Sequence, residues 1–209
     1  MKKAFTLAEV LITLGVIGVV AAMTLPSLIN NKQNKELEAA LKKNYTVINQ
    51  ALDMYQAEFG ERVTQNNCEA RKLKEILTKY LNLSSTKVFA SYINQYKNYN
   101  ETSSLNYGLF DDGVFMLNDG SLYFLENGGQ RIYITVDVNG YFKRPNRLGY
   151  DLFMFQIDKN GKLLPMGAKG TNCYSTTDYY CSRTSTSDLN GAGCTLKALT
   201  DNNYFNSLP

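Results

Sequence analysis

The side chains that could carry out chemistry in this sequence are carboxylates, amides and thiols, because the chain contains no histidine. Its 209 residues include 19 Asp and Glu, 22 Lys and Arg and four Cys, but neither His nor Trp. Without histidine, Ser-His-Asp and Cys-His catalysis are excluded, and the commonest zinc ligand is missing. A carboxylate pair could still hydrolyse a substrate, but no spacing indicates one. We therefore expect no enzymatic activity and no cofactor.

One carboxylate, Glu9, lies within an apolar segment where a charge is costly. It is the single charged residue from Phe5 to Leu25, a span that as a helix is roughly 31 Å long and crosses a bilayer core. A charge in such a place usually has a partner. If the chain were cut after Ala4, the new α-amino group of Phe5 would lie one helical turn from Glu9. In an assembly of staggered helices, the amine of one subunit could then pair with the carboxylate of the next.

Two simpler interpretations of this segment leave the acidic residue unexplained. A secretory signal peptide has a basic start, a shorter apolar stretch and a small-residue cleavage site, which Ala21-Ala22-Met23 could provide. A simple membrane anchor accounts for the length alone. For a membrane-spanning helix, Lys2 and Lys3 predict a cytoplasmic N-terminus by the positive-inside rule, so that the residues after Leu25 lie outside the cytoplasm.

Residues 1–26 resemble the leader and membrane helix of type IV prepilins and type II secretion pseudopilins. The resemblance is carried by Lys2-Lys3-Ala4, by Phe5-Thr6-Leu7-Ala8-Glu9, and by the long apolar run that ends in Leu25-Pro26. It implies cleavage between Ala4 and Phe5 by a prepilin peptidase, N-methylation of Phe5, and a role for Glu9 in setting subunit register. The family usually has glycine before the cut, where this chain has Ala4.

The resemblance implies a structural subunit, a pilin or pseudopilin, of a type IV pilus or type II secretion filament. Such a prepilin is inserted once in the bacterial cytoplasmic (inner) membrane with its head extracytoplasmic, and after assembly it lies in a filament or at the cell surface. The implied partners are other pilin-like subunits, the prepilin peptidase, the assembly platform, its ATPase and the membrane. The alternatives are a minor tip pilin that binds DNA or a surface, and a membrane-anchored extracytoplasmic domain of unrelated function.

A small basic and aromatic cluster is the feature that favours the DNA alternative. Lys143, Arg144 and Arg147 lie close in sequence to Tyr141 and Phe142, and stacking together with phosphate contacts could hold a strand. A solvated loop accounts for the same residues. Because the net charge is only +3, which gives no general electrostatic case for nucleic acid, we favour the loop and do not expect DNA binding.

The periodicity of apolar residues predicts which elements position these side chains. After Pro26, where we expect a kink, a helical stripe with steps of three and four predicts that the first helix continues to Phe59, with Gly60 as its stop. From residue 107 onward, short apolar runs separated by Asp-Gly and Asn-Gly turns predict four or five antiparallel strands. The expected fold is α+β and pilin-like, with a long N-terminal helix, membrane-spanning in its first half, packed on a small antiparallel sheet.

We therefore expect five consecutive parts in the chain. They are a leader peptide (1–4), a transmembrane and filament-core helix (5–26), the amphipathic second half of the same helix (27–60), an α+β head with an antiparallel sheet (61–166) and a Cys-containing C-terminal surface loop (167–209).

The cysteines are candidates for disulfides, because the predicted topology places them outside the cytoplasm, where disulfides persist. Cys68, Cys173, Cys181 and Cys194 allow three pairings. We favour Cys181 with Cys194, which leaves Cys68 with Cys173. A disulfide-bounded C-terminal loop also recurs in type IV pilins. Four free, buried thiols are the alternative.

Oxygen-bearing side chains in the predicted turns are candidates for calcium ligands. Asp137, Asn139, Asp151 and Asp158 could supply oxygen atoms to a hard cation, and some pseudopilin heads bind calcium in a loop near the C-terminal strands. Asp and Asn are also favoured in turns for reasons unrelated to metals. We favour the turn interpretation.

Overall fold

The computed structural model describes residues 6–129 and 131–208. The chain divides into two compact units, Met1–Glu36 and Leu37–Pro209. We refer to the described residues of the first unit, 6–36, as the stem, and to those of the second unit, 37–129 and 131–208, as the head.

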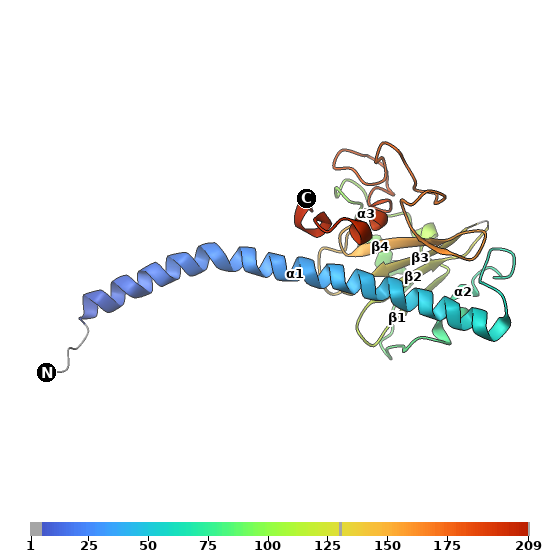
Figure 1. Ribbon diagram of the computed structural model, residues 1–209, viewed down its shortest axis with the longest axis horizontal. Helices are drawn as coiled ribbons and strands as arrows, with labels where there is room; N and C mark the ends of the chain where they lie inside the picture. The colour runs from blue at the N-terminus through green and yellow to red at the C-terminus, as the bar shows by residue number, and fades with distance from the viewer. Residues whose placement is uncertain (1–5, 130, 209) are drawn as a thin grey trace. The chain divides into compact units, whose positions relative to one another are not determined.

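The longest element is helix α1, which runs from Leu7 to Phe59 and contributes to both units (Figure 1). Up to Ile29 it has apolar residues on all sides, whereas in the head one face is buried in steps of three and four. The buried residues of α1 are Leu37, Leu41, Asn44, Ile48, Ala51, Leu52 and Tyr55. The helix ends as predicted, because Gly60 has a φ of +78° and its N–H donates to the Gln56 carbonyl at 2.8 Å, a common arrangement after a helix C-terminus.

Pro26 lies inside α1, and the helix is continuous on both sides of it. Since proline has no N–H, the carbonyl one turn earlier lacks its usual helical donor. The helix continues through Pro26 without a break, and the kink stays a prediction.

The head contains a five-stranded antiparallel sheet with the strand order β1-β2-β3-β4-β5, so that every strand pairs with its neighbour in sequence. The strands are β1 (Gly113–Met116), β2 (Leu122–Glu126), β3 (Ile132–Asp137), β4 (Leu152–Ile157) and β5 (Leu163–Pro165). The register pairs Tyr123 with Val136 and Val136 with Phe153. This sheet and α1 confirm the predicted α+β, pilin-like fold class.

Both faces of the sheet are buried, and they form two separate apolar clusters. On one face Tyr123, Val136 and Phe153 join Leu41 and Ile48 of α1. The hydroxyl of Tyr123 donates to Asn44 Oδ1 at 2.5 Å, which satisfies a polar group in this core. Residues on the opposite face of the strands pack against connecting segments, including short 3-10 helices, rather than against α1.

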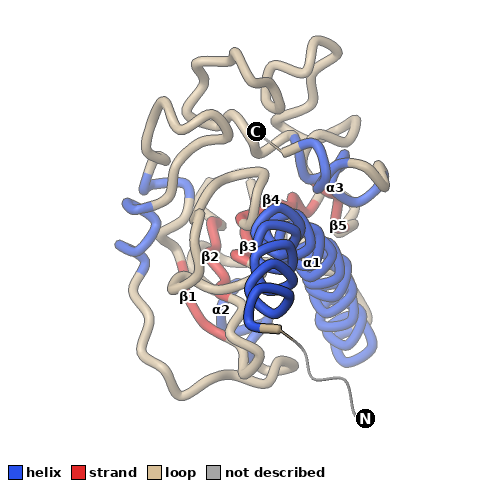
Figure 2. Tube along the Cα trace, turned by 90° about the vertical axis from the view of Figure 1, so that its left-hand side faces the viewer, coloured by secondary structure: helices blue, strands red, loops and turns tan. Residues whose placement is uncertain are grey.

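The opposite face of the sheet is covered by the segment that precedes β1 and by part of the C-terminal region. Figure 2 shows these loops on the side of the strands away from α1. The covering segment contains the short 3-10 helices η1 (Ala90–Gln95) and η2 (Tyr107–Leu109). Tyr96 and Phe110 from this layer are fully buried. The layer closes a face that would otherwise expose its aromatic residues to water.

The C-terminal region differs from the surface loop that we predicted for 167–209. It contains helix α3 (Cys194–Thr200) and the 3-10 helix η3 (Tyr204–Ser207), and Tyr204 and Phe205 are buried in the cluster on the α1 side of the sheet. The reason is that Phe205 packs edge to face on Phe153 of β4, with ring centroids 6.0 Å apart. Helix α2 (Leu73–Thr78) is the remaining helix of the described head.

Candidate functional site

At the start of α1, Thr6 and Glu9 form a reciprocal pair of helix-capping contacts. The Thr6 N–H and hydroxyl each donate to Glu9 Oε2 at 2.8 Å, and the Glu9 N–H lies 3.2 Å from Thr6 Oγ1. This is the capping-box arrangement, whose Thr-x-x-Glu signature is present in the sequence and was not used in our sequence analysis. The predicted cleavage and methylation residues, Ala4 and Phe5, lie outside the described residues.

The surface of the stem around Glu9 is apolar and exposed on every side. Its large exposed side chains are Leu7, Val10, Leu11, Ile12, Leu14, Val16, Ile17, Val19, Val20, Met23, Leu25, Leu28 and Ile29. The N-terminal part of α1 is long and apolar enough to cross a membrane. Among the described residues, no cation pairs with Glu9, so its charge is held only by the donors of its own helix end.

The cysteines give one disulfide and two free thiols. Cys181 and Cys194 are bonded, with their Cα atoms 4.9 Å apart, which confirms the favoured pair. The pairing of Cys68 with Cys173 is wrong, because both residues are free and buried. They lie in the two different apolar clusters, Cys68 on the α1 side of the sheet and Cys173 on the opposite side. Burial raises the pKa of the Cys68 thiol to about 11 and that of Cys173 to about 12, which makes both thiols poor nucleophiles at neutral pH.

Two of the four candidate calcium ligands form a buried pair at the two ends of the β3–β4 loop. Asp137 is the last residue of β3 and pairs in register with Leu152, so Asp151, the residue before β4, lies beside it. Both carboxylates are fully buried. Strand pairing brings these two side chains together. The sequence did not indicate this contact, because the two residues are far apart in the chain.

Main-chain donors of the loop hold both carboxylates, and Asp137 also accepts from Tyr96, which lies in the segment before β1. Asp137 Oδ1 accepts from the Gly140 N–H at 2.8 Å and from the Asn139 N–H at 3.2 Å, and its Oδ2 accepts from the Tyr96 hydroxyl. Asp151 Oδ1 accepts from the Arg147 N–H at 2.6 Å. These donors are neutral, so they orient the two carboxylates without cancelling their charge.

The electrostatics of this pair are unfavourable to two negative charges. Burial, and then repulsion by Asp151, raise the pKa of Asp137, and burial raises the pKa of Asp151. The side chain of Arg147, whose main chain binds Asp151, has other partners: its guanidinium donates to the Tyr99 carbonyl and to Glu101 Oε1 at 2.8 Å. Within the described ranges 6–129 and 131–208, no ion pair involves either carboxylate.

The amide side chains of the same loop are incompletely satisfied. Asn139 Oδ1 and Asn146 Oδ1 are buried and accept no hydrogen bond from any described residue. The Asn139 side chain favours the charged form of the Asp151 carboxylate, and the Asn146 N–H donates to Asp151 Oδ2 at 2.8 Å. Two carboxylates and two buried amide oxygens therefore lie in one loop, and these are the donor types that a hard cation takes.

The fourth candidate, Asp158, lies apart from this group in the turn between β4 and β5. Its Oδ1 accepts from the N–H groups of Asn160 and Lys162 at 2.9 and 2.8 Å. Such bonds are typical of an aspartate that stabilises a turn, which is the interpretation that we favoured.

In a second acidic group, which our sequence analysis did not identify, two of the three carboxylates pair with arginines. Carboxylate oxygens of Asp111, Asp112 and Glu126 lie within 4.8 Å of one another. Arg71 Nε is 2.9 Å from Asp112 Oδ1, and Arg131 Nε is 3.5 Å from Glu126 Oε1. This group is therefore an ion-pair network between surface segments.

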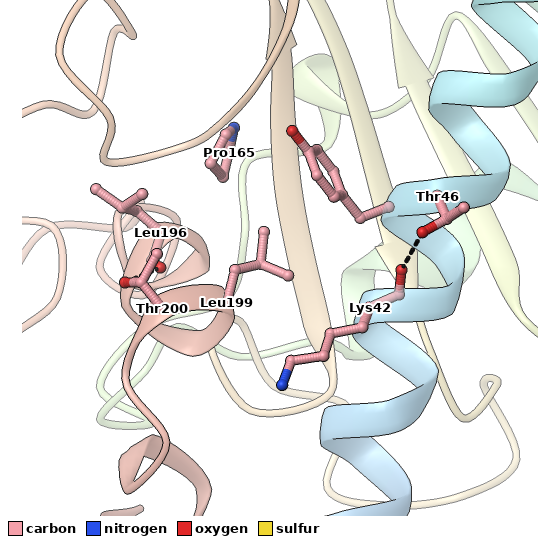
Figure 3. A pocket seen from close by; sticks show the side chains of 7 residues that line it. Lys42, Thr46, Pro165, Leu196, Leu199 and Thr200 are labelled. Carbon is pink, nitrogen blue, oxygen red and sulfur yellow. Dashed lines mark hydrogen bonds between the residues drawn. The ribbon is translucent and has the colours of Figure 1, made fainter.

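A shallow pocket of about 400 Å³ lies between α1, β5 and α3 (Figure 3). Its lining residues are Lys42, Tyr45, Thr46, Pro165, Leu196, Leu199 and Thr200. The Thr46 hydroxyl donates to the Lys42 carbonyl at 3.0 Å and that of Thr200 to the Leu196 carbonyl at 2.8 Å, so both are used within their own helices. The lining offers no acid and no nucleophilic thiol for chemistry.

The basic and aromatic cluster that favoured DNA is not assembled as one surface. Arg147 is buried and bound to the Tyr99 carbonyl, and Tyr141 stacks on Tyr92 with ring centroids 4.2 Å apart. Phe142, Lys143 and Arg144 remain exposed. The structure therefore removes one of the three cations from the predicted cluster.

Comparison with known proteins gives one result. A protein-family model, described as a family of unknown function (DUF6613), matches residues 27–207. No curated protein and no solved structure matches the chain.

Proposed function

The chain belongs to the DUF6613 family, and we propose that it acts as a pilin-like structural subunit, inserted in the bacterial inner membrane as a prepilin and assembled into a filament through its N-terminal helix. The family match begins at residue 27 and so leaves the leader-like motif of residues 1–26 outside it. The proposal therefore rests on that motif and on the stem, not on the family.

The observation that carries the proposal is one acidic residue on an apolar helix. Glu9 is the single charged residue in the part of α1 that could cross a membrane, and the side chains around it are exposed. A helix that is apolar all round needs either lipid or other helices around it. A filament core of neighbouring stems supplies the second environment, in which leucine, isoleucine and valine side chains pack against one another.

In this proposal Glu9 selects how far one stem is displaced along the next. Cleavage before Phe5 creates a terminal amine next to Thr6, the residue that already donates to Glu9. Away from water, a carboxylate and an amine of neighbouring subunits attract strongly, and a register that leaves them unpaired is penalised. The capping contacts orient the carboxylate at the helix end, where that amine would lie.

The head in this proposal is extracytoplasmic and forms the filament surface. The Cys181–Cys194 disulfide supports this location, because such bonds persist outside the cytoplasm. The partners that the proposal requires are the prepilin peptidase, an assembly platform with its ATPase, and other pilin-like subunits.

The experiment that tests the proposed class is mass spectrometry of the mature N-terminus, on protein isolated from membranes of the native host. We expect a chain that begins at Phe5 and carries one N-methyl group. A chain that retains Met1 would contradict the proposal and leave a membrane-anchored domain, and a chain that begins at Met23 or later would identify a signal peptide. A chain that carries Gly in place of Ala4 is a positive control, because it restores the residue that the family usually has before the cut.

A further inference from the structure

We propose that the head binds an acidic polysaccharide, a chain of sugars that carry carboxylate groups, on a surface of aromatic and basic side chains. The aromatic part consists of Phe89, Tyr92, Tyr141 and Phe142, which we call the aromatic row. The inference concerns only the head, so it does not depend on the filament role. It rests on the assembly of the row, on its exposure to water and on the charge of the side chains that accompany it.

Tertiary contacts assemble the aromatic row from two segments that are far apart in the sequence. Its first two residues belong to η1 and to the position just before it, whereas its last two lie in the β3–β4 loop. Main-chain hydrogen bonds hold the two segments together. The Lys97 N–H donates to the Asn146 carbonyl at 3.1 Å, and the Leu148 N–H donates to the Lys97 carbonyl at 2.9 Å. The row is therefore a feature of the folded head, and no single stretch of sequence contains it.

The four rings of the row are in contact one after another. Tyr92 stacks on Tyr141, with ring centroids 4.2 Å apart. At one end Phe89 meets Tyr92 edge to face, with centroids 5.8 Å apart. At the other end Phe142 meets Tyr141 edge to face at 5.2 Å. The tyrosines are partly buried, but Phe89 is 57% exposed and Phe142 is 76% exposed. Both ends of the row therefore present a large apolar ring to water, and connected apolar surface of this kind marks a binding site.

Cations accompany the row, and acids are missing from the two segments that form it. Lys87, Lys143 and Arg144 are exposed, and none of them forms an ion pair with another described residue. Residues 82–100 and 138–150 contain no Asp or Glu. The charge of the two segments therefore favours an anionic ligand over a neutral or cationic one.

A chain of acidic sugars complements both the rings and the cations of this surface. The face of an aromatic ring carries partial negative charge and attracts the C–H groups on the apolar side of a sugar. The Gln95 amide can donate to and accept from sugar hydroxyl groups. It is exposed and lies three residues after Tyr92 in η1, and in a 3-10 helix residues three apart lie on the same side. Carboxylates on the sugars pair with the Lys and Arg side chains.

Single-stranded DNA is the other polymer that aromatic and basic side chains bind. Its affinity comes largely from contacts between cations and phosphates. One cation of the cluster that would favour DNA, Arg147, is buried and bound to Tyr99 and Glu101. In addition, the two tyrosines of the row stack on each other, so each covers a ring face on which a base would otherwise stack. We therefore favour the polysaccharide, and DNA binding is one outcome of the test.

The test measures binding of the full chain, in detergent micelles, to immobilised polymers by biolayer interferometry. The probes are polygalacturonate and alginate, which are two polymers of acidic sugars, together with methyl-esterified polygalacturonate and a single strand of thymidine nucleotides. We expect both acidic polysaccharides to bind, and the esterified form to bind roughly tenfold more weakly, because esterification removes the charge and keeps the sugar. No binding to either acidic polysaccharide would overturn the proposal. Tighter binding to the single strand, or equal binding to the esterified form, would also overturn it.

Substitutions of the exposed rings test whether the polysaccharide binds on the aromatic row. We expect Phe89→Ala and Phe142→Ala each to weaken binding of polygalacturonate roughly tenfold, because truncating an aromatic anchor is costly in an interface. Their Tm should equal that of the wild type, since both rings are exposed. Tyr179→Ala, which removes an exposed ring of the C-terminal region, is the matched control and should bind as the wild type does.

The cations are tested by a matched pair of double substitutions. Lys143→Gln combined with Arg144→Gln should weaken binding roughly tenfold and reduce its dependence on salt concentration, because fewer charges are then screened. Lys159→Gln combined with Lys169→Gln removes two exposed lysines from the turns after β4 and β5, and this control should bind as the wild type does. If the substitutions of the row and of its cations have no more effect than the controls, the polysaccharide binds elsewhere and the proposal is overturned.

Discussion

At the scale of single residues, three acidic side chains of this chain lie where a charge is costly, and their surroundings differ. Glu9 is bonded to donors of its own helix end, whereas Asp137 and Asp151 share a buried loop without a cation from the described residues. In both cases neutral donors set the geometry of the carboxylate and leave its charge uncompensated. For Glu9 we expect the amine of a neighbouring subunit as the partner, whereas the raised pKa of each buried aspartate favours its protonated form.

The two roles available to Glu9 can be separated by a substitution that keeps one of them. Glutamine is accepted at the third position of a capping box, so Glu9→Gln preserves the helix start and removes the charge. We expect both Glu9→Gln and Glu9→Ala to lower incorporation into filaments at least tenfold, as measured by the amount of subunit in sheared filaments. Thr6→Ala removes the capping partner and keeps the charge, and we expect it to be incorporated. Normal incorporation of Glu9→Gln would show that the role of Glu9 is helix capping alone.

The buried aspartates predict a pH dependence of stability in the absence of divalent cations. Burial and mutual repulsion raise the pKa of Asp137, and burial raises that of Asp151, so between the ordinary carboxyl pKa of about 3.9 and these raised values the folded chain binds more protons than the unfolded chain. The pair therefore contributes most to the free energy of unfolding at low pH, and this contribution is lost as the pH rises through this window.

The measurement is urea unfolding in EGTA between about pH 5 and about pH 8, with wild type compared with Asp151→Asn at each pH. We expect the wild type to lose stability relative to the variant as the pH rises, because the variant has no second charge in the loop. The Tyr96 hydroxyl and the Asn139 amide also face the pair, but neither changes its charge in this range. A constant difference between the two proteins would mean that the two carboxylates do not repel each other in the fold.

At the scale of elements, α1 uses one continuous helix for two environments. Up to Ile29 its large side chains are exposed, and from Leu37 onward one face lies in the core of the head. The change follows the sequence, because an all-apolar surface gives way to a stripe with steps of three and four. The same element therefore supplies a surface for lipid or neighbouring helices and a wall of the head.

This division predicts how substitutions along the second half of α1 act. Leu41→Ala removes a fully buried side chain from the cluster on the α1 side of the sheet, and we expect a loss of about 2–5 kcal/mol in the free energy of unfolding. Met54→Ala, on the exposed side of the same helix segment, should cost no more than about 0.5 kcal/mol. Urea unfolding followed by tyrosine circular dichroism of the head measures both. Equal effects of the two substitutions would contradict the packing of α1 on the sheet.

At the scale of the whole molecule, the head is closed by its C-terminal region. The Cys181–Cys194 disulfide joins the preceding loop to the first residue of α3, and Phe205 after α3 packs on β4. The family match covers the head and ends at residue 207, so this closure belongs to the part of the chain that the family shares.

Counting thiols tests this arrangement directly. In unreduced, denatured protein we expect two reactive thiols per chain, Cys68 and Cys173, and in the folded protein we expect both to react slowly because they are buried and protonated. Four reactive thiols would contradict the disulfide. Replacing Cys181 with Ser should then lower the free energy of unfolding by about 2–4 kcal/mol, because the unfolded chain is no longer restricted.

Much of the fold could be predicted from local sequence patterns. The end of α1 at Phe59, the strand runs and their turns, and the α+β class follow from periodicity and from glycines with positive φ, such as Gly60 and Gly161, because these depend on neighbours within a few residues. The capping of α1 by Thr6 and Glu9 could also have been predicted from the sequence, because its signature spans four residues. The pairing of Cys181 with Cys194 was one of three possibilities, and sequence only favoured it.

Only the tertiary structure decided which side chains meet across long separations in sequence. Strand pairing brings Asp151 beside Asp137 and leaves Asp158 in an exposed turn, although both Asp-x-Asn-Gly segments look alike. The sheet places Cys68 and Cys173 in different clusters. Arg147 binds a main-chain carbonyl and so does not join the basic cluster. The physical reason is that the charge and solvation of a residue depend on its burial and its contacts, which a local pattern does not specify.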